Sequence, residues 1–386
     1  MKPTFWGYDR GDGRVGIRNH VLVVATVSCA NHVVDLIARK TDTIPITHEH
    51  GCLQFGADRE LTERTLLNLG SSPNVGAVLY VGLGCEQTPT ASIAQSMIGK
   101  PAGYLLIQEA GGTAQAVQQG IGLIGRMKEQ TLPQERRRFE VAALQAAVKC
   151  GGSDYTTALA SNPAVGAAAD MLIAQGGAVF LTETPGLPGS EHILARRAVN
   201  RDVARQIYRI VDAYREEVRT RFGRNISDGN PSPGNMDGGI TTLVEKSIGT
   251  IKKGGSGPVQ GVIGFAESTF GKDGLWIMDT PGHDVFSVSG PAAGGVHVNW
   301  FTTGRGSPLG NAITPVIKIC GNPETYRRMR EDMDIDAGVV MTGQKSIEEV
   351  GKEIFDFTLR VANGEPTKSE GLEHREFAIP RIGSTL

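Results

Sequence analysis

The chain has 386 residues, of which 40% are hydrophobic and 21% charged, the ordinary balance of a folded globular protein. Its 39 Lys and Arg nearly match its 41 Asp and Glu, and a net charge of -2 argues against broad binding to nucleic acid or to a membrane surface. No apolar run is long enough to cross a bilayer and the first residues lack a secretory signal, so we expect a cytoplasmic protein with five reduced cysteines.

Short apolar runs rich in Val, Ile and Leu, each followed by a polar loop with glycine, recur along the chain at 20–32, 77–90, 177–186, 274–284 and 297–307. Runs of this kind are typical of parallel strands that are covered on both faces. Helical periodicity predicts helices at 57–70, 112–130 and 190–223. Strands that alternate with helices predict an α/β fold.

Two stretches interrupt this alternation. Residues 223–239 are rich in Gly, Asn, Pro and Ser and are predicted to form a loop, and residues 251–261 (IKKGGSGPVQG) have the composition of a linker. We therefore predict a central mixed α/β domain over residues 1–254 and a second α/β domain over residues 255–386.

The segment HEHGCLQFG, residues 48–56, concentrates side chains that bind metals. His48 and His50 lie two positions apart, and alternate residues of a strand point to the same side, so both imidazoles can reach one ion. Cys52 continues this spacing, and borderline metals accept imidazole and thiolate ligands. The alternative is a turn that happens to contain histidine, with a buried structural cysteine.

Polar side chains follow the predicted strands, where parallel sheets bind their ligands. They are Cys29, Cys85, Glu86, Glu183, Asp279, Thr302 and Arg305. If these strand ends converge, they form one polar pocket, in which Arg305 suits bidentate capture of a carboxylate.

Two further loops are candidates for substrate binding. KCGGSDYTT (149–157) presents Ser153 and Asp154 at a predicted helix N-terminus, which either binds an anion or is a plain helix cap. NPSPGNMDGG (230–239) presents Asn230 and Asn235 on a rigid frame that either shapes a pocket or only connects two elements. The chain has no GxxxxGK[ST], GxSxG or HExxH motif, which disfavours nucleotide-phosphate loops, serine hydrolases and zinc proteases.

Several motifs occur in a fixed order: GRVGIRNHVLVVATVSC, GAVLYVGLGCE, CGGSD, LTETPG, NPSPGN, MDTPG, FTTGRGS and EDMDIDAG. Together they resemble the altronate and galactarate dehydratase family over residues 7–370, nearly the whole chain. The resemblance implies a hydro-lyase that removes water from a sugar acid such as altronate or galactarate and yields a 2-keto-3-deoxy acid. It also implies a Rossmann-like fold for the C-terminal domain.

The same resemblance implies a divalent metal, with Fe(II) favoured and Mn(II) as the other choice. Longer members begin with a small antifreeze-like domain, which is expected here as a separate small subunit, so a homo- or hetero-oligomer is expected. The implied metal ligands are His48, His50, Cys85 and Glu86. The implied catalytic residues are His48, His50, Glu183 and His283. The implied substrate-binding residues are Ser153, Asp154, Asn230, Asn235, Thr302 and Arg305.

Two alternatives stay open at this point. The large subunit of a sulfolactate sulfo-lyase resembles this family and releases sulfite in place of water. A non-catalytic subunit that binds a metabolite is the other. Where several sugar-acid dehydratases have motifs such as HPYGCSQ or HTEGCGMS, this chain has HEHGCLQFG, with a second histidine and bulky residues at 53–55. The substrate therefore stays undefined by sequence.

Overall fold

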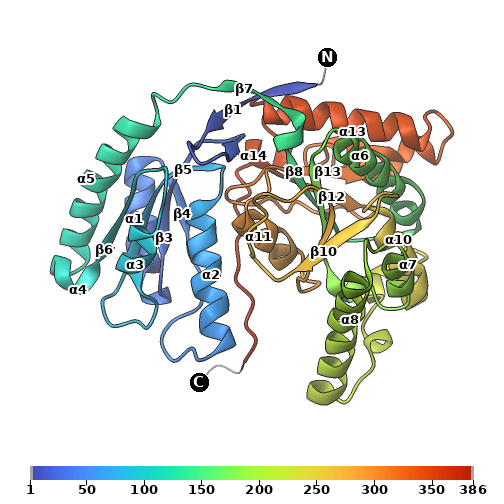
Figure 1. Ribbon diagram of the computed structural model, residues 1–386, viewed down its shortest axis with the longest axis horizontal. Coiled ribbons are helices and arrows are strands. Elements are labelled where there is room, and N and C mark those ends of the chain that lie inside the picture. The colour runs from blue at the N-terminus through green and yellow to red at the C-terminus, as the bar shows by residue number, and fades with distance from the viewer. Residues whose placement is uncertain (1–2, 384–386) are drawn as a thin grey trace.

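The computed structural model describes residues 3–383, and its two parallel sheets occupy the left and right halves of Figure 1. The first sheet has the order β4-β3-β5-β6, with β3 at His20–Ala25, β4 at Ile44–Ile46, β5 at Val75–Gly82 and β6 at Ala102–Leu106. Its helical segments are η1 (Ser28–Ala30), α1 (Asn31–Thr41), α2 (Ala57–Ser71), α3 (Thr90–Gln95), α4 (Ile107–Ala110) and α5 (Thr113–Thr131).

Strand β3 shows why a continuous apolar run forms here. Its side chains alternate between two cores, because Val21 and Val23 pack with helices α1 and α5, whereas Leu22 and Val24 pack with helix α2. A strand covered on both faces needs apolar residues at every position. The predicted strands at 20–32 and 77–90 are thereby confirmed, as are the helices predicted at 57–70 and 112–130.

The second sheet has seven strands in the order β10-β11-β9-β8-β12-β13-β14, and every neighbouring pair is parallel. Its strands are β8 (Gln145–Cys150), β9 (Ala178–Leu181), β10 (Val259–Ile263), β11 (Gly274–Met278), β12 (Val298–Thr303), β13 (Val316–Cys320) and β14 (Ile335–Asp336). Its α-helices are α6 (Asn162–Ala174), α7 (Glu191–Arg196), α8 (Arg201–Phe222), α9 (Pro233–Asp237), α10 (Leu243–Lys252), α11 (Asp284–Gly294), α12 (Pro323–Arg328), α13 (Ile347–Ala362) and α14 (Lys368–Gly371).

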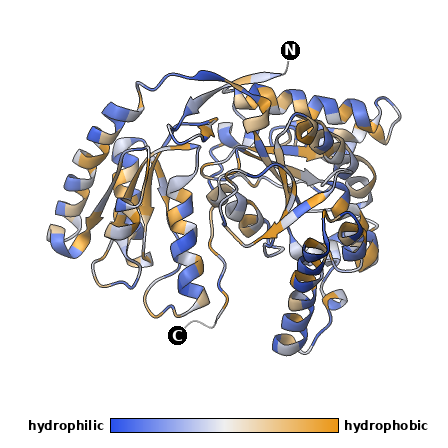
Figure 2. Cartoon of the chain, viewed as in Figure 1, coloured by the Kyte–Doolittle hydropathy of each residue, from blue (hydrophilic) through white to orange (hydrophobic). Residues whose placement is uncertain are grey.

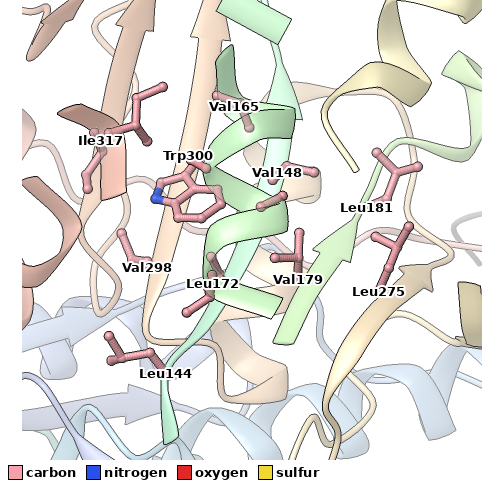
Figure 3. Packing of buried hydrophobic residues seen from close by; sticks show 14 of the residues in the cluster. Leu144, Val148, Val165, Leu172, Val179, Leu181, Leu275, Val298, Trp300 and Ile317 are labelled. Atoms are coloured by element: carbon pink, nitrogen blue, oxygen red, sulfur yellow. The ribbon is translucent and has the colours of Figure 1, made fainter. Parts of the chain in front are cut away.

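Short helical turns complete this half: η2 (Val141–Ala143), the π-helical turn η3 (Thr157–Ser161), η4 (Thr184–Gly186), η5 (Ile226–Asp228) and η6 (Ala337–Val340). The main core lies between the sheet and helices α6 and α13. Figure 3 shows Trp300 of β12 beside Val165 and Leu172 of α6. The indole N–H of Trp300 donates to Thr358 Oγ in α13 at 2.9 Å, so burial of the ring leaves no polar atom unpaired.

A small antiparallel sheet connects the halves at the top of Figure 1. Its order is β2-β1-β7, with β1 at Thr4–Asp9, β2 at Val15–Gly16 and β7 at Arg137–Glu140. Strand β7 follows α5 of the first half and precedes β8 of the second. Phe5 of β1 packs into the core of the larger sheet and anchors the connection there.

The boundary predicted between residues 254 and 255 is wrong. Strands β8 and β9, before it, belong to the same sheet as β10 to β14, after it. The segment 251–261, expected to be a linker, is the end of α10 and the start of β10, and Lys253 within it is fully buried. Glycine there serves close packing, because a Cβ on Gly255 would lie 2.3 Å from Asp170 Oδ1. The chain divides after α5, near residue 131.

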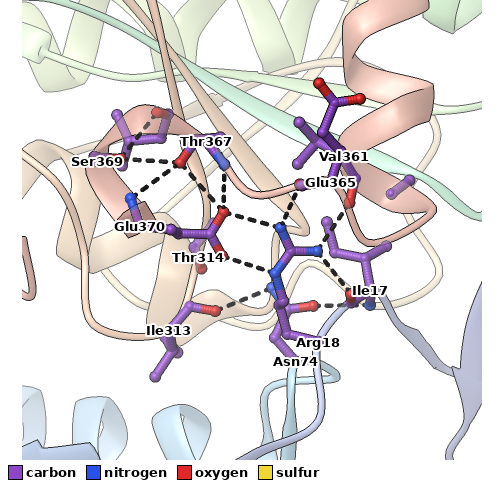
Figure 4. Close-up of polar contacts among 12 residues, drawn as sticks. Ile17, Arg18, Asn74, Ile313, Thr314, Val361, Glu365, Thr367, Ser369 and Glu370 are labelled. Atoms are coloured by element: carbon purple, nitrogen blue, oxygen red, sulfur yellow. Dashed lines mark hydrogen bonds and ion pairs between the residues drawn. The ribbon is translucent and has the colours of Figure 1, made fainter. Parts of the chain in front are cut away.

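The two halves share contacts on several levels. Helix α2 packs against α11, and one hydrophobic cluster includes Leu66 of the first half and Ala292 of the second. Figure 4 shows a polar junction centred on Arg18, whose guanidinium pairs with Glu370 at 2.7 Å and donates to the carbonyl of Val361. The C-terminal segment 376–383 then runs between the halves in Figure 1.

The helix predicted over 190–223 is two helices. The chain breaks at residues 197–200, where Ala198 bridges to Val259 of β10 and the Asn200 side chain caps α8. Helix α8 then extends away from the sheet with a strongly polar outer surface (Figure 2). In residues 3–383, no helix combines the length and the apolarity that a membrane crossing requires.

Candidate active site

The candidate active site lies at the carboxyl edge of the seven-stranded sheet, between β8 and β12. These strands are paired neighbours, yet the chain places β9 to β11 on one side of them and β13 and β14 on the other. Such a reversal opens a crevice in which parallel sheets bind ligands. The loops that follow the two strands meet there, because the backbone N–H groups of Gly304 and Arg305 donate to the carbonyl of Gly152.

The loop after β8 is held tightly by Asp154. Its buried carboxylate accepts hydrogen bonds from the backbone N–H of Thr157 at 3.1 Å and from Asn322 Nδ2 at 3.0 Å. A Cβ on Gly304 would lie 1.8 Å from Asp154 Oδ1, so only glycine fits at that position. Asp154 therefore acts as the helix cap that was the alternative interpretation, and it fixes the β12 loop against the β8 loop.

The predicted loop 230–239 folds onto the same edge, where its side chains contact Lys246 of α10. Sequence reasoning missed this lysine. Asn230 Nδ2 donates to the carbonyl of Pro185 at 2.8 Å, and Asn235 Nδ2 donates to the carbonyl of Ser153 at 2.9 Å. Lys246 Nζ donates to the side-chain oxygens of Asn230 and Asn235 at 2.8 and 2.9 Å. The two asparagines thus position the ammonium of Lys246 beside the loop after β8.

A buried ion cluster lies behind these loops. Lys149 Nζ contacts Glu183 Oε1 at 2.9 Å and Asp284 Oδ1 at 3.2 Å, and donates to the carbonyl of Gly282 at 3.0 Å. Lys253 Nζ lies 3.4 Å from the second oxygen of Glu183, and no part of the Lys253 side chain is exposed. Two ammonium groups and two carboxylates therefore compensate one another at the ends of β8, β9 and β11.

The charges of the ion cluster determine the protonation states of Glu183 and Lys149. Burial by itself raises the pKa of Glu183, but the ammonium groups of Lys149 and Lys253 outweigh it and lower that pKa to about 2. Burial by itself lowers the pKa of Lys149, but Glu183 and Asp284 raise it above its ordinary value. Both groups are ionised at neutral pH, so Glu183 is a poor proton acceptor. Its backbone has a positive φ of 73°, a strained conformation that often marks functional sites.

Three other predicted residues of this edge differ in their accessibility. Thr302 is fully buried, and its hydroxyl donates to Asn162 Oδ1 at 2.6 Å, so it supports the sheet from inside. Arg305 is exposed, and its guanidinium lies beside Gly234 of α9. His283 is also exposed, at the start of α11, with its ring centroid 5.0 Å from that of Phe286.

The histidines of HEHGCLQFG lie in the other half and are committed to internal hydrogen bonds. His48 Nδ1 accepts from the backbone N–H of His50 at 3.1 Å, so Nε2 carries the proton and donates to the carbonyl of Ala25 at 3.0 Å. Burial and the neighbouring His50 lower the pKa of His48 to about 4, which keeps it neutral. His50 Nε2 donates to the carbonyl of Ile379 at 2.8 Å. Neither nitrogen of His48 has a lone pair left for a metal.

The remaining predicted ligands do not complete a metal centre. Burial by itself raises the pKa of Glu86, but hydrogen bonds from Gly84 N–H and the hydroxyls of Thr90 and Thr26 outweigh it and lower that pKa. Cys85 is exposed nearby. Among residues 3–383, no three His, Cys, Asp or Glu side chains form a group able to hold an ion. The expected ligand set therefore does not fit a metal in this arrangement.

The convergence expected of the strand ends occurs in two separate groups. Glu183, Asp279 and Arg305 follow strands of the seven-stranded sheet and Thr302 lies within β12, whereas Cys29, Cys85 and Glu86 follow strands of the first sheet. Sequence reasoning missed the site residues Lys149, Lys246 and Lys253. Only Lys149 leaves a feature in the sequence that could have revealed it. Lys149 interrupts the apolar strand sequence AAVKC directly before a glycine loop, where an unpaired charge is costly.

Comparisons with known proteins agree with the division of the chain near residue 131. Residues 7–131 match the family described as D-galactarate dehydratase/altronate hydrolase, second domain, and residues 141–385 match D-galactarate/altronate dehydratase, C-terminal. The chain is 37% identical over 384 residues to (2R)-sulfolactate sulfo-lyase subunit beta of Chromohalobacter salexigens, a match that covers 98% of this chain and 97% of that protein. It is 33% identical to altronate dehydratase of Bacillus subtilis, covering 99% of this chain and 78% of that one. It is 32% identical to galactarate dehydratase (L-threo-forming) of Escherichia coli, covering 94% and 73%.

Proposed function

The chain belongs to the D-galactarate/altronate dehydratase family, and from that premise we propose that it is a hydro-lyase acting on a sugar acid. The proposed reaction removes water from a 2,3-dihydroxy carboxylate, such as altronate or galactarate, and gives a 2-keto-3-deoxy acid. The position of the site supports this activity, because a groove of about 540 Å³, lined by Tyr155, Arg305 and Asn322 among others, lies at the switch between β8 and β12.

The single observation that carries the proposal is the placement of two cations around the short helix α9. Arg305 Nε lies 3.5 Å from the position of a Cβ on Gly234, and Lys246 Nζ lies 2.9 Å from Asn235 Oδ1 in the next residue. A guanidinium holds a carboxylate with two hydrogen bonds, and an ammonium stabilises negative charge that develops on a substrate in the transition state. We assign these two roles to Arg305 and Lys246.

Of the implied catalytic residues, His50, Glu183 and His283 are the candidates for the base that takes the proton, and the contacts favour one. Glu183 is held ionised by two lysines, and its pKa of about 2 makes it a weak base. His50 is buried and bonded to the C-terminal segment through Ile379. His283 is exposed at the same sheet edge as Arg305, so its imidazole is free to approach a bound substrate. We therefore assign proton abstraction to His283.

The proposed chemistry balances without a further reactant. The His283 imidazole takes the proton from C2, next to the carboxylate, and the electron pair forms the C2–C3 double bond as hydroxide leaves C3. The imidazolium returns a proton to the departing hydroxide, which leaves as water. The resulting enol becomes the 2-keto acid by moving its hydroxyl proton to C3.

The ion cluster gives His283 a fixed position in this scheme. Lys149 binds the carbonyl of Gly282 and the carboxylate of Asp284, the residues on either side of His283. Small displacements of a catalytic group cost large factors in rate, so this anchoring favours turnover. Lys149 is thus proposed as a positioning residue, with all its polar contacts inside the protein.

A requirement for Fe(II) or Mn(II) stays a prediction, and no step above depends on an ion. Purification of the chain without chelators, followed by metal analysis and reconstitution with each ion, tests the requirement. Coordination of an ion by His48 would require a rearrangement of the first sheet's loops, because both nitrogens of His48 are engaged.

The second candidate function is release of sulfite from sulfolactate. It is favoured by the relative with 37% identity, whose alignment covers 97% of that protein. The same relative is a subunit, which supports the proposal that this chain works with a separate small subunit. We also propose, from the reversed strand order, that the seven-stranded half is Rossmann-like.

The deciding experiment is a substrate screen on the anaerobically purified chain, with and without added Fe(II) and a candidate small subunit. Altronate, galactarate and sulfolactate are assayed in parallel for 2-keto acid and for sulfite. A 2-keto-3-deoxy product without sulfite supports the hydro-lyase, and sulfite with pyruvate replaces it by the sulfo-lyase. A chain that binds these acids without turnover under every condition indicates a non-catalytic subunit.

The role of His283 has its own test in the active preparation. We expect His283→Gln to lower kcat by about 100-fold or more, the usual contribution of a general base. His32→Gln is the matched control, since His32 is an exposed histidine on α1 of the other half. Equal activity of the two variants refutes the assignment.

A further inference from the structure

Helix α10 packs one side against the seven-stranded half and leaves the opposite side uncovered. Its buried residues are Ser247, Gly249, Thr250 and Ile251. Its exposed residues are Val244, Glu245, Ile248 and Lys252. Each residue of a helix advances by about 100°, so these four exposed side chains lie within about 100° of the helix circumference. Figure 1 shows α10 on the side of this half that lies away from the first sheet.

The uncovered side of α10 is apolar at its centre. Val244 is 47% exposed and Ile248 is 42% exposed. The turn η3 packs closely beside them, because a Cβ on Gly249 would lie 3.1 Å from the Cβ of Ala158. Leu159, the next residue of η3, is 57% exposed. Apolar side chains that gather on a surface in this way are typical of an interaction site.

We define the α10 face as Leu159, Val244, Glu245, Ile248 and Lys252. Its charges have opposite signs on either side of Ile248, with Glu245 three residues before it and Lys252 four residues after it. Glu245 accepts from the backbone N–H groups of Thr241 and Thr242 with Oε2, which leaves its other oxygen for a further donor. Among residues 3–383, the ammonium of Lys252 has no hydrogen-bond or ion-pair partner.

This arrangement of charges is complementary to itself. Glu245 and Lys252 lie on the same flank of the helix, at nearly equal distances from Ile248 along its axis. If two copies of α10 pack antiparallel with Ile248 against Ile248, each Glu245 faces the Lys252 of the other copy. A twofold axis requires such a surface, because each residue meets its counterpart in the same way on both sides.

We propose that the α10 face is the contact between two copies of this chain, related by a twofold axis that passes beside Ile248. The face is smaller than a standard interface of roughly 20–30 residues for each partner, so we expect the dimer to dissociate in the micromolar range. None of its five residues belongs to the candidate active site, so the dimer does not depend on the proposed function.

Sedimentation velocity of the full chain between about 1 and 100 µM tests this proposal. We expect the sedimenting mass to rise toward that of two chains, and Ile248→Asp to weaken the association by about tenfold or more. Ile98→Asp is the matched control, since Ile98 is 72% exposed and lies in the first half, and it is expected to associate like the unchanged chain. Circular dichroism shows that each variant is folded.

Charge reversal tests the antiparallel arrangement. An exposed ion pair contributes little by itself, so neutralising Lys252 is expected to leave association almost unchanged. Lys252→Glu places two carboxylates together and is expected to weaken association. The double variant Glu245→Lys with Lys252→Glu exchanges the two charges and is expected to associate more tightly than Lys252→Glu alone. A double variant that associates as weakly as Lys252→Glu overturns the proposal.

Other results would also overturn it. One is a chain that stays monomeric up to about 100 µM. Another is a dimer that Ile248→Asp and Ile98→Asp weaken equally. A third is a monomeric chain that binds a candidate small subunit and loses that binding in Ile248→Asp, because the α10 face then belongs to the small subunit.

Discussion

Replacing Lys149 with methionine tests the ion cluster that supports the candidate active site. Methionine keeps a flexible apolar stem but removes the ammonium that contacts Glu183 at 2.9 Å and Asp284 at 3.2 Å. Removal of one partner from a buried ion pair costs about 3–5 kcal/mol, because the other charge stays buried. Lys253 remains 3.4 Å from Glu183, so we expect a loss near the lower limit, about 3 kcal/mol at pH 7.

The same cluster makes this loss depend on pH. The pKa of Glu183 falls from 4.5 to about 2 on folding, a difference of about 2.5, or roughly 3 kcal/mol at 1.4 kcal/mol for each unit. Because the folded-state pKa is the lower one, the contribution is present above about pH 4.5 and is lost as the pH falls through about 2. The difference in stability between the unchanged chain and Lys149→Met is therefore largest near neutrality and shrinks in acid.

Urea unfolding at pH 7 and at pH 3, followed by circular dichroism, measures both effects. Lys252→Met is the matched control, because Lys252 is the exposed neighbour of Lys253 and its loss is expected to change stability by less than about 0.5 kcal/mol. A loss in Lys149→Met below about 1 kcal/mol at pH 7, or one that is equal at both pH values, refutes this account of the cluster.

Three further substitutions test other parts of the structure. Gly304→Ala puts a Cβ 1.8 Å from a carboxylate oxygen, so it should lower stability by about 1–3 kcal/mol, whereas Gly257→Ala, with no atom within 4 Å, should change little on thermal unfolding. His48→Ala leaves the N–H of His50 and the carbonyl of Ala25 without their side-chain partner and should cost about 2 kcal/mol of stability, measured by urea unfolding. Asp58→Asn can no longer accept both N–H groups of residues 382–383, and faster hydrogen exchange there should reveal it; unchanged exchange contradicts the contact.

The sequence by itself determined the parallel sheets, and the reason is local. A strand covered on both faces needs apolar residues throughout, and a loop at a strand end needs glycine, so both leave a readable pattern in runs such as HVLVVA. The same pattern predicted that polar residues follow the strands, and the order of the motifs carried the family resemblance. Periodicity was less informative for residues 190–223, where the break at Ala198 comes from its bridge to β10.

Only the tertiary structure decided which polar residues act together. Neighbours in this sheet come from distant parts of the chain, so the partners of Glu183 are Lys149 and Lys253, which no spacing rule connects. The division into domains depended on the same long-range pairing. A glycine-rich linker and a glycine-rich packing contact have the same composition, so the sequence does not distinguish them. His48 and His50 matched a metal motif in sequence, but burial and nearby carbonyl groups gave their nitrogens internal partners. Side-chain type limits the chemistry available at a position, and the surrounding backbone decides which part of it is used.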